Sequence, residues 1–418
     1  MSKSKKQAIP KLRFIDFKDD EKWDITTLGK LSIPVEDRAG EDSYTLMSIT
    51  TGVGLIPQTV KFGREIAGNS YKNYYVIQNG DFAYNKSATK LYPEGYIAML
   101  QGYDKAALPN SIFTCFRIVD KESSPRFFNH LFCSNYHGKW LRKYITVGAR
   151  ANGALSVDNK YLWKMPIALP KLNEQLKIAD CLSSLDELIS AENEKLLALR
   201  DHKKGLMQKL FPADGKSLPE WRFPEFRDCG KWSLKSIRNT CISYSGGTPD
   251  TSKKEYYGGE IPFIRSGEID KKSTELFLTE DGLINSSAKM VDIGDVLVAL
   301  YGANSGEVAL SKISGAINQA ILCLKHESSN AFVYHYLSHM KQRIIKTYVQ
   351  GGQGNLSGEI IKSIELRIPK RLEEQQKIAD CLSAFDELIT TQLDKVESLK
   401  LHKIALMQGL FPVIEEVI

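Results

Sequence analysis

The peptide KIADCLSSLDELI at residues 177–189 occurs a second time, as KIADCLSAFDELI, at residues 377–389. Eleven of the thirteen positions agree, and the two copies lie 200 residues apart. The match extends without gaps over 172–212 and 372–412, where 24 of 41 residues are identical. A long internal repeat of this kind predicts that one structural unit is used twice.

Both copies carry apolar residues in alternating steps of four and three, the heptad spacing of a helix that packs against another helix. These positions are Ile178, Leu182, Leu185, Ile189, Leu196, Leu199, Leu206 and Leu210, and then Ile378, Leu382, Phe385, Ile389, Val396, Leu399, Leu406 and Leu410. Prolines precede the copies at 170 and 369 and follow them at 212 and 412. Because proline interrupts regular structure, we expect one helix between each pair, roughly 55–60 Å long.

Polar residues interrupt the heptad pattern at the same two places in each copy: Glu192 and Lys203, then Gln392 and Lys403. A parallel pair in register would set Lys203 against Lys403, which is repulsive. An antiparallel pair sets Glu192 near Lys403 and Gln392 near Lys203, so we expect antiparallel helices. The alternative is that each helix packs separately on its own domain.

A second, weaker repeat precedes each long helix, because PKLRFIDFKDDEKW (10–23) resembles PEWRFPEFRDCGKW (219–232). Between the repeats lie short apolar runs punctuated by Gly, Asn and Pro, which predict strands. We expect strands at NYYVIQ, GYIAML, SIFTCFRI and GDVLVALY, and helices around 125–144 and 330–348. NGDFAYNKSA (79–88) occupies the place of IGDVLVALYG (293–302), which suggests one domain fold used twice.

The predicted fold class is therefore α/β (α+β), with two mixed α/β domains separated by two long antiparallel coiled-coil helices in an internal pseudo-two-fold repeat. The boundaries that we expect are 1–168 for the first domain, 169–213 for the central helix, 214–366 for the second domain and 367–418 for the C-terminal helix.

Composition narrows the class of protein. Of 418 residues, 42% are hydrophobic and 25% charged, as in a soluble globular protein, and no apolar run is long enough to span a membrane. The basic start lacks the apolar stretch of a secretory signal. Seven cysteines, none in a C-x-x-C pair, favour reduced thiols in a cytoplasm. The net charge of +6 permits nucleic-acid binding without requiring it.

The motifs of common catalytic sites are missing from the sequence. It has no G-x-x-x-x-G-K loop, no G-x-G-x-x-G after a strand and no G-x-S-x-G elbow. His335 and His339 lie one helical turn apart, but no glutamate follows the first, as a zinc protease requires. We therefore expect no catalytic residues, no metal site and no cofactor on this chain, and favour a binding protein.

Several stretches carry a resemblance to a known family. The helical copies, with KIADCLS and LMQ-x-LFP, the R-F-x-x-F openers, SGGTPDTSKKEYYGGEIPFIRSGEI (245–269) and GGQGNLSGEIIKSIELRIPKRLEEQQKI (351–378) resemble the specificity subunit of type I restriction-modification enzymes. The resemblance implies two target-recognition domains, each reading half of a split sequence in double-stranded DNA. It also implies that the helices bind two identical methyltransferase subunits, through which restriction subunits join. S-adenosylmethionine, ATP and Mg²⁺ then belong to those partners.

Identical polar residues outside the heptad positions suggest one partner surface used twice, since packing asks only for apolar character. The alternative is a recent duplication. The predicted partner-binding residues are Asp180, Asp186, Glu187, His202, Lys203 and Gln208, with Asp380, Asp386, Glu387, His402, Lys403 and Gln408.

Polar and basic residues beside turn signals are candidates for DNA contacts, because such side chains reach base edges and phosphates. They are Arg64, Lys86, Lys90 and Arg150 in the first domain, and Lys253, Lys254, Arg265, Lys271, Lys272, Asn304 and Gln353 in the second. The alternative for each is an ordinary solvated charge.

Two other functions remain open at this point. One is a coiled-coil adaptor whose globular domains bind proteins. The other is a self-contained methyltransferase or nuclease, which the missing cofactor and phosphate motifs disfavour.

Overall fold

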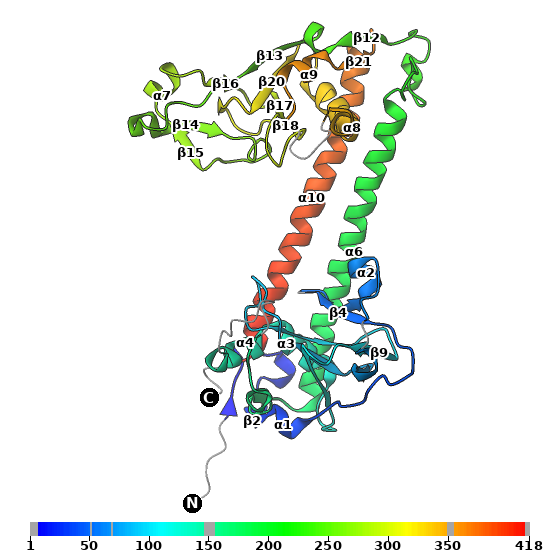
Figure 1. The fold of residues 1–418 in the computed structure, drawn as a ribbon, viewed down its shortest axis with the longest axis vertical. Helices are drawn as coiled ribbons and strands as arrows, with labels where there is room; N and C mark the ends of the chain where they lie inside the picture. The colour runs from blue at the N-terminus through cyan, green and yellow to red at the C-terminus, as the bar shows by residue number, and fades with distance from the viewer. Residues whose placement is uncertain (1–6, 51, 68–69, 146–154, 349–354, 414–418) are drawn as a thin grey trace, which may run out of the picture. The chain divides into compact units, whose positions relative to one another are not determined.

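The computed structural model describes residues 7–50, 52–67, 70–145, 155–348 and 355–413 (Figure 1). They form two compact units, Met1–Glu192 with Lys395–Ile418, and Asn193–Asp394. The long helices α6 (Leu172–Leu210) and α10 (Leu372–Leu410) each contribute to both units. Within the described residues, no helix is long and apolar enough to cross a membrane.

The first unit is built on an antiparallel four-stranded sheet in the order β3–β10–β7–β8. A three-stranded sheet, β1–β2–β11, and the pairs β4–β5 and β6–β9 complete its strands. The strands are β1 (Gln7–Ala8), β2 (Trp23–Thr27), β3 (Ser32–Pro34), β4 (Met47–Thr50), β5 (Gly54–Pro57), β6 (Tyr75–Gln78), β7 (Phe82–Asn85), β8 (Tyr96–Met99), β9 (Lys105–Leu108), β10 (Phe113–Ile118) and β11 (Pro166–Leu169). The shorter helices are η1 (Ile15–Phe17), α1 (Leu28–Leu31), α2 (Gln58–Phe62), η2 (Tyr71–Asn73), α3 (Pro125–Cys133), α4 (Tyr136–Leu141), η3 (Arg142–Tyr144) and α5 (Asn159–Trp163).

The second unit contains a four-stranded antiparallel sheet in the order β13–β20–β17–β18, a mixed sheet β15–β14–β19–β16 and the pair β12–β21. The strands are β12 (Ser233–Ser236), β13 (Cys241–Ser245), β14 (Tyr257–Ile264), β15 (Leu276–Leu278), β16 (Lys289–Val291), β17 (Val296–Ala299), β18 (Val308–Leu310), β19 (Gly315–Ile317), β20 (Ile321–His326) and β21 (Glu365–Ile368). The helices are η4 (Pro224–Phe226), η5 (Ile237–Asn239), η6 (Lys254–Tyr256), α7 (Glu280–Ile284), α8 (Asn330–Tyr348) and α9 (Gly358–Ser363).

The main sheets of the two units follow one plan, as the sequence predicts. Asp81 precedes β7 and Asp295 precedes β17, and each carboxylate accepts a 2.8 Å hydrogen bond from the backbone N–H three residues earlier. Arg117 on β10 pairs with Asp81 at 2.6 Å, and Lys325 on β20 pairs with Asp295 at 3.0 Å. The glycine-aspartate turn therefore anchors the central strand to its neighbour in both units.

The helix expected over 125–144 is broken in the structure. Helix α3 ends at Cys133, and Asn135 adopts a left-handed conformation with φ 59°. A side chain at Gly138 would meet the Asn135 amide oxygen at 2.2 Å, so the glycine makes room for this turn. In the second unit, α8 runs unbroken over the expected stretch.

The long helices run antiparallel within each unit. In the first unit Asp186 of α6 meets Lys403 of α10, and Glu192 meets Lys395 at 2.5 Å. Residue numbers thus rise along one helix as they fall along the other. In the second unit Lys203 of α6 pairs with Asp386 of α10 at 2.5 Å. Antiparallel pairing is confirmed, but Lys403 pairs with Asp186 instead of the expected Glu192.

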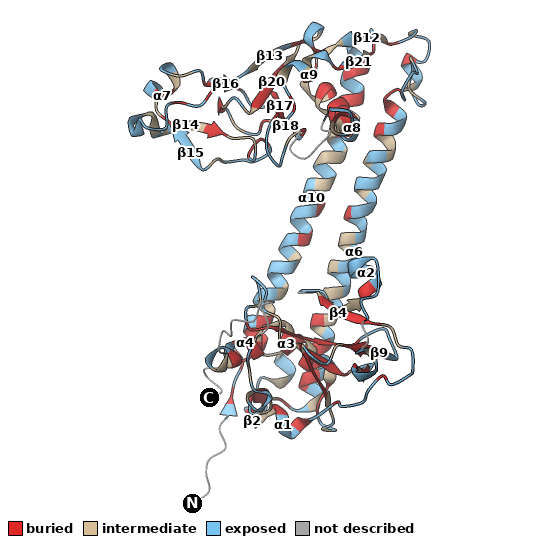
Figure 2. Ribbon diagram, in the orientation of Figure 1, coloured by how far each residue is buried: buried red, intermediate tan, exposed pale blue. Residues whose placement is uncertain are grey.

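Each unit packs its docking helix, α3 or α8, between the main sheet and both long helices (Figure 2). In the first unit Phe127 and Phe132 share a core with Leu182 of α6 and with Phe411, just beyond α10. The second core joins α8 to both long helices in the same way. Burial of these faces, at about 25 cal/mol per Å² of apolar surface, holds each domain on the helix pair.

Candidate nucleic-acid interface

A buried histidine marks the point where α3 meets both long helices in the first unit. His130 Nε2 lies 3.1 Å from Ser183 Oγ on α6, and His130 Nδ1 lies 3.9 Å from Asp186. Asp186 in turn pairs with Lys403 of α10. Burial, with the nearby Lys403 ammonium, lowers the pKa of His130 to about 4, so the imidazole is neutral near pH 7.

The second unit repeats this junction with its own residues. His335 of α8 lies 3.1 Å from Ser383 Oγ and 3.8 Å from Asp386, which pairs with Lys203. Burial and the Lys203 ammonium lower the pKa of His335 to about 3. His339, one turn later, is half-buried beside Phe211. His335 and His339 therefore both contact neighbouring parts of the second unit.

The opener segments attach to the N-terminal ends of the long helices through buried ion pairs. Arg13 binds Glu174 with two bonds of 2.8 and 2.7 Å. Arg222 binds Glu374 with bonds of 2.6 and 2.7 Å, and Trp232 Nε1 donates a third bond of 3.2 Å to the same carboxylate. Each opener thus has a fixed position on its own unit.

Sequence reasoning missed these docking residues, although the repeats contain a signal for them. Arg13 and Arg222 occupy the same place in the two openers, and Glu174 and Glu374 the same place in the helical repeat. The histidines follow a phenylalanine by three residues in both docking helices. A charged or titratable residue that recurs at the same place in both halves of the sequence therefore indicates a docking contact.

The predicted partner-binding residues fall into two groups. Asp186, Lys203, Asp386 and Lys403 join the long helices to one another, which is itself a structural reason for their identity. The remaining residues are exposed on the helices, although some already have contacts. These are Asp180, which pairs with Arg126, Asp380, which accepts a bond from Gln376, His202, which packs on Phe385, and Glu187, Gln208, Glu387, His402 and Gln408.

The DNA-contact candidates of the first unit differ in their exposure to solvent and in their contacts with the rest of the domain. Arg64 and Lys90 are exposed. Lys86 is half-buried, and its ammonium donates a 2.7 Å bond to the Asn159 side chain. Burial lowers the pKa of Lys86. Arg150 lies outside the described residues, so Arg64 and Lys90 are the accessible members of this set.

In the second unit Lys254, Lys271, Lys272 and Asn304 are exposed. Two other candidates have contacts with their own domain: Lys253 donates a 3.0 Å bond to Tyr256, and Arg265 pairs with Glu268 at 3.0 Å and with Glu275 at 2.6 Å. Gln353 lies outside the described residues.

The glycines of SGGTPDTSKKEYYGGE mark close packing inside the second unit. A side chain at Gly246 would meet the Ile317 carbonyl oxygen at 1.7 Å, and one at Gly247 would meet Ser287 Oγ at 1.9 Å. At Gly259 the nearest atom, the Leu278 carbonyl oxygen, would be 2.4 Å away. This stretch therefore brings β14, β15 and β19 together, and close approach to a neighbouring backbone requires Gly246 and Gly259.

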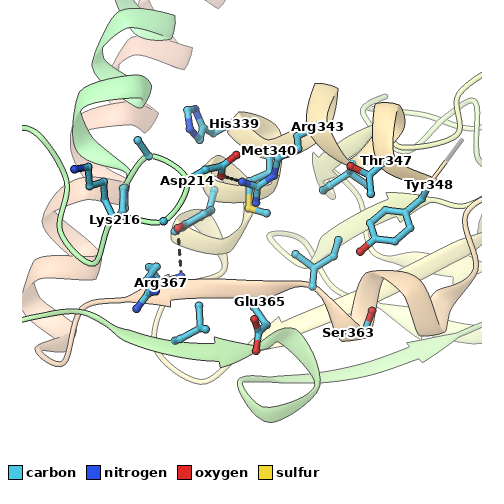
Figure 3. A pocket seen from close by; sticks show the side chains of 17 residues that line it. Asp214, Lys216, His339, Met340, Arg343, Thr347, Tyr348, Ser363, Glu365 and Arg367 are labelled. Carbon is cyan, nitrogen blue, oxygen red and sulfur yellow. Dashed lines mark hydrogen bonds and ion pairs between the residues drawn. The ribbon is translucent and has the colours of Figure 1, made fainter.

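An open cleft of about 680 Å³ lies beside α8 in the second unit (Figure 3). Its opposite wall is the linker after α6, and Asp214 of that linker pairs with Arg343 of α8 across the opening. In the described part of the chain, no three His, Cys, Asp or Glu side chains are grouped to hold a metal ion.

Comparison with known proteins places this architecture. The family model described as type I restriction modification DNA specificity domain matches residues 59–200 and 230–398. A putative type I restriction enzyme MjaX specificity subunit of Methanocaldococcus jannaschii is 27% identical over 323 residues, covering 75% of this chain and 73% of the relative. The EcoR124I/EcoR124II specificity subunit of Escherichia coli is 24% identical over 256 residues, covering 55% of this chain and 59% of the relative.

Solved structures share the fold. The S subunit of the type I restriction-modification system from M. genitalium matches with a TM-score of 0.61 at 15% identity, over 97% of this chain and 99% of that one. A chain from a study of complex assembly and conformational transition of the type I R-M system matches with a TM-score of 0.57 at 18% identity, over 93% of this chain and 97% of that one. With two matched segments that make up more than half of its length, the chain belongs to the type I restriction-modification DNA specificity family.

Proposed function

We propose that this specificity subunit reads a two-part DNA sequence, one half-site with each recognition domain, the domains spanning 1–168 and 214–366. The observation that carries the proposal is the duplication of the docking contacts: the same Arg–Glu pair and the same His–Ser–Asp–Lys junction hold two otherwise diverged domains. Such an arrangement, in which constant helices and docking contacts hold two variable domains, suits two domains that each recognise a different DNA sequence. The catalytic activities of the enzyme reside on its modification and restriction subunits.

The proposed DNA contacts come from the exposed members of the predicted sets first. Arg64, Lys90, Lys254, Lys271, Lys272 and Asn304 are exposed, so we propose them first as contacts to phosphates or base edges. The other proposed contacts are Lys86, Arg150, Lys253, Arg265 and Gln353.

The long helices are the proposed binding surface for two modification subunits, one on each unit, with restriction subunits joining through the complex. Leu188 and Leu388 occupy the same repeat position and are 43% and 53% exposed. A single exposed leucine is ordinary, but the same apolar side chain exposed in both copies of the repeat supports one partner surface used twice. The exposed polar residues of the repeat, including Glu187, His402 and Gln408, border them. S-adenosylmethionine, ATP and Mg²⁺ are assigned to the partner subunits, and the seven free thiols fit a cytoplasmic complex.

The direct test is methylome sequencing of cells with and without the gene. We expect one bipartite motif to lose methylation when the gene is removed. The double variant Lys271→Gln, Lys272→Gln should then relax sequence specificity at the second half-site alone. The matched double variant Arg64→Gln, Lys90→Gln should relax it at the first half-site alone. No lost motif, or no sequence preference with partners bound, would contradict the proposal and favour an adaptor. Methylation or cleavage by the purified chain alone would establish a self-contained enzyme.

Partner stoichiometry tests the helix surfaces separately. Leu188→Asp and Leu388→Asp should each remove one modification subunit, and the double variant both, as measured by native mass spectrometry of the complex. Two bound copies in the double variant would exclude this surface.

A further inference from the structure

Two short helices of the first recognition domain are joined by a stack of aromatic rings. Tyr144 at the end of η3 lies 4.0 Å from Tyr161 of α5 with an interplanar angle of 9°. Trp140 of α4 lies 5.2 Å from Tyr144 and donates a 2.8 Å hydrogen bond from Nε1 to the Tyr161 carbonyl oxygen. All three rings are half-buried, so α4, η3 and α5 form one rigid surface.

Four exposed lysines border this stack. Lys139 and Lys143 adjoin Trp140 and Tyr144 in sequence, and Lys160 and Lys164 lie on either side of Tyr161. Each pair is spaced four residues apart, so like charges lie close together along the chain. Within the described residues, only Lys160 of the four has an ion-pair partner, Asp158 at 3.0 Å. Folding alone does not account for this concentration of charge.

The surface carries further positive charge and little negative charge. Arg142 lies between the two lysine-bearing turns and its side chain is 70% exposed, while its partner Glu94 is 3% exposed. Lys86 reaches Asn159 at the N-terminal end of α5. In the described part of the chain, the acidic residues that pair with these basic side chains are Asp158 and Glu94, and Glu94 is 3% exposed.

Basic residues on the docking and following helices of the second unit are mostly neutralised. Lys341 and Arg343 of α8 pair with Glu307 and Asp214, and Lys362 of α9 pairs with Glu359 at 3.1 Å. Lys346 is exposed without an ion pair among the described residues. The two recognition domains therefore differ in their electrostatics although their main sheets share one plan.

We propose that Lys139, Lys143, Lys160 and Lys164 form a phosphate-contact surface that holds the DNA backbone next to the half-site read by the first domain. This inference rests on the proposed function, since it takes DNA as the ligand. Exposed lysines suit phosphates, whereas the centres of protein–protein interfaces are depleted in lysine. The aromatic stack holds the two lysine-bearing segments together, so only the lysine side chains remain to be ordered when DNA binds.

The experiment uses the full chain assembled with its modification subunits and the bipartite duplex identified by methylome sequencing. The variant replaces all four lysines with glutamine, and the matched control replaces four other exposed lysines of the same unit. The control residues are Lys18, Lys30, Lys105 and Lys121.

Each lost phosphate contact lowers the slope of log affinity against log salt by about 0.9. We expect the four-lysine variant to lose about three to four units of slope, and the control to keep the wild-type slope. Discrimination between correct and altered half-sites should be unchanged, because phosphate contacts position the protein and base contacts specify. The pair Lys139→Gln and Lys143→Gln alone should lose about half as much slope.

An unchanged slope in the four-lysine variant would overturn the inference. Loss of modification-subunit binding with an unchanged slope would also overturn it and assign the surface to a protein partner. If the wild-type complex itself shows no preference for any duplex, the proposed function fails, and this outcome is distinct from a failure of the lysine surface.

Discussion

Replacing Glu374 with glutamine should strongly destabilise the second unit. The Glu374 side chain is fully buried and that of Arg222 is 8% exposed, so the guanidinium would stay in the interior without its counter-charge. The glutamine amide accepts through one atom only, and its NH₂ group faces a guanidinium N–H, donor against donor. Breaking a buried pair by removing one partner costs about 3–5 kcal/mol.

Replacing both Arg222 and Glu374 separates the cost of an unpaired buried charge from the cost of losing the side chains themselves. Arg222→Met should cost a similar amount, because it leaves the fully buried Glu374 carboxylate without its counter-charge. The double change Arg222→Met with Glu374→Leu should recover most of the loss, since apolar replacement of a buried pair is often neutral, and should retain a cost of about 1–3 kcal/mol because Trp232 Nε1 loses its acceptor.

Urea unfolding measured by hydrogen exchange suits this chain, because two units need not unfold together. Peptides covering 214–240 and 363–380 report the affected region, and peptides of the first unit serve as the internal control. The matched change Glu174→Gln should cost a similar amount in the first unit, where Arg13 is 10% exposed. A cost below about 1 kcal/mol for Glu374→Gln, or a double variant as unstable as both single changes combined, would refute the reasoning.

Two further predictions concern titration and glycine packing. The pKa of His335, lowered to about 3 by burial, lies below the unfolded value of about 6.5, so stability is lost as pH falls below about 6.5. His335→Gln should reduce the stability difference between pH 7 and pH 5 by about 2 kcal/mol in urea unfolding, and an unaltered difference would contradict this. Gly246→Ala should destabilise the protein by about 1–3 kcal/mol, because the new Cβ would meet Ile317. Gly205→Ala should stabilise it by about 0.5–1 kcal/mol, because the space there is open and the second helix has Ala405 at the matching position. Thermal unfolding of the two variants distinguishes these outcomes.

The sequence was sufficient to predict the long helices and their antiparallel direction. A heptad pattern over many turns leaves few alternatives, and Lys203 opposite Lys403 excludes the parallel arrangement. The individual ion pairs could not be predicted, because a shift of six residues, nearly two helical turns, exchanges Glu192 for Asp186 as the partner of Lys403. Ion pairs depend on the axial offset, which the heptad pattern does not determine.

Local signals also failed where distant residues decide the structure. The break after α3 depends on Asn135 and Gly138, which read as ordinary helix residues. The docking histidine His130 meets Ser183 from 53 residues away, and Lys86 is held by Asn159, 73 residues further along the chain. Candidate DNA contacts chosen beside turn signals therefore divide into free and engaged groups only in three dimensions.

The duplicated docking contacts have a consequence for how this protein can change over generations. A foreign recognition domain needs an arginine in its opener and a histidine on its docking helix to meet Glu174 and Ser183, or Glu374 and Ser383. The rest of the domain can vary where it does not face the helices, since apolar residues such as Phe127 and Phe132 also pack on them. Exchange of a gene segment between the two KIADCLS regions would therefore place a different recognition domain on an unchanged pair of helices.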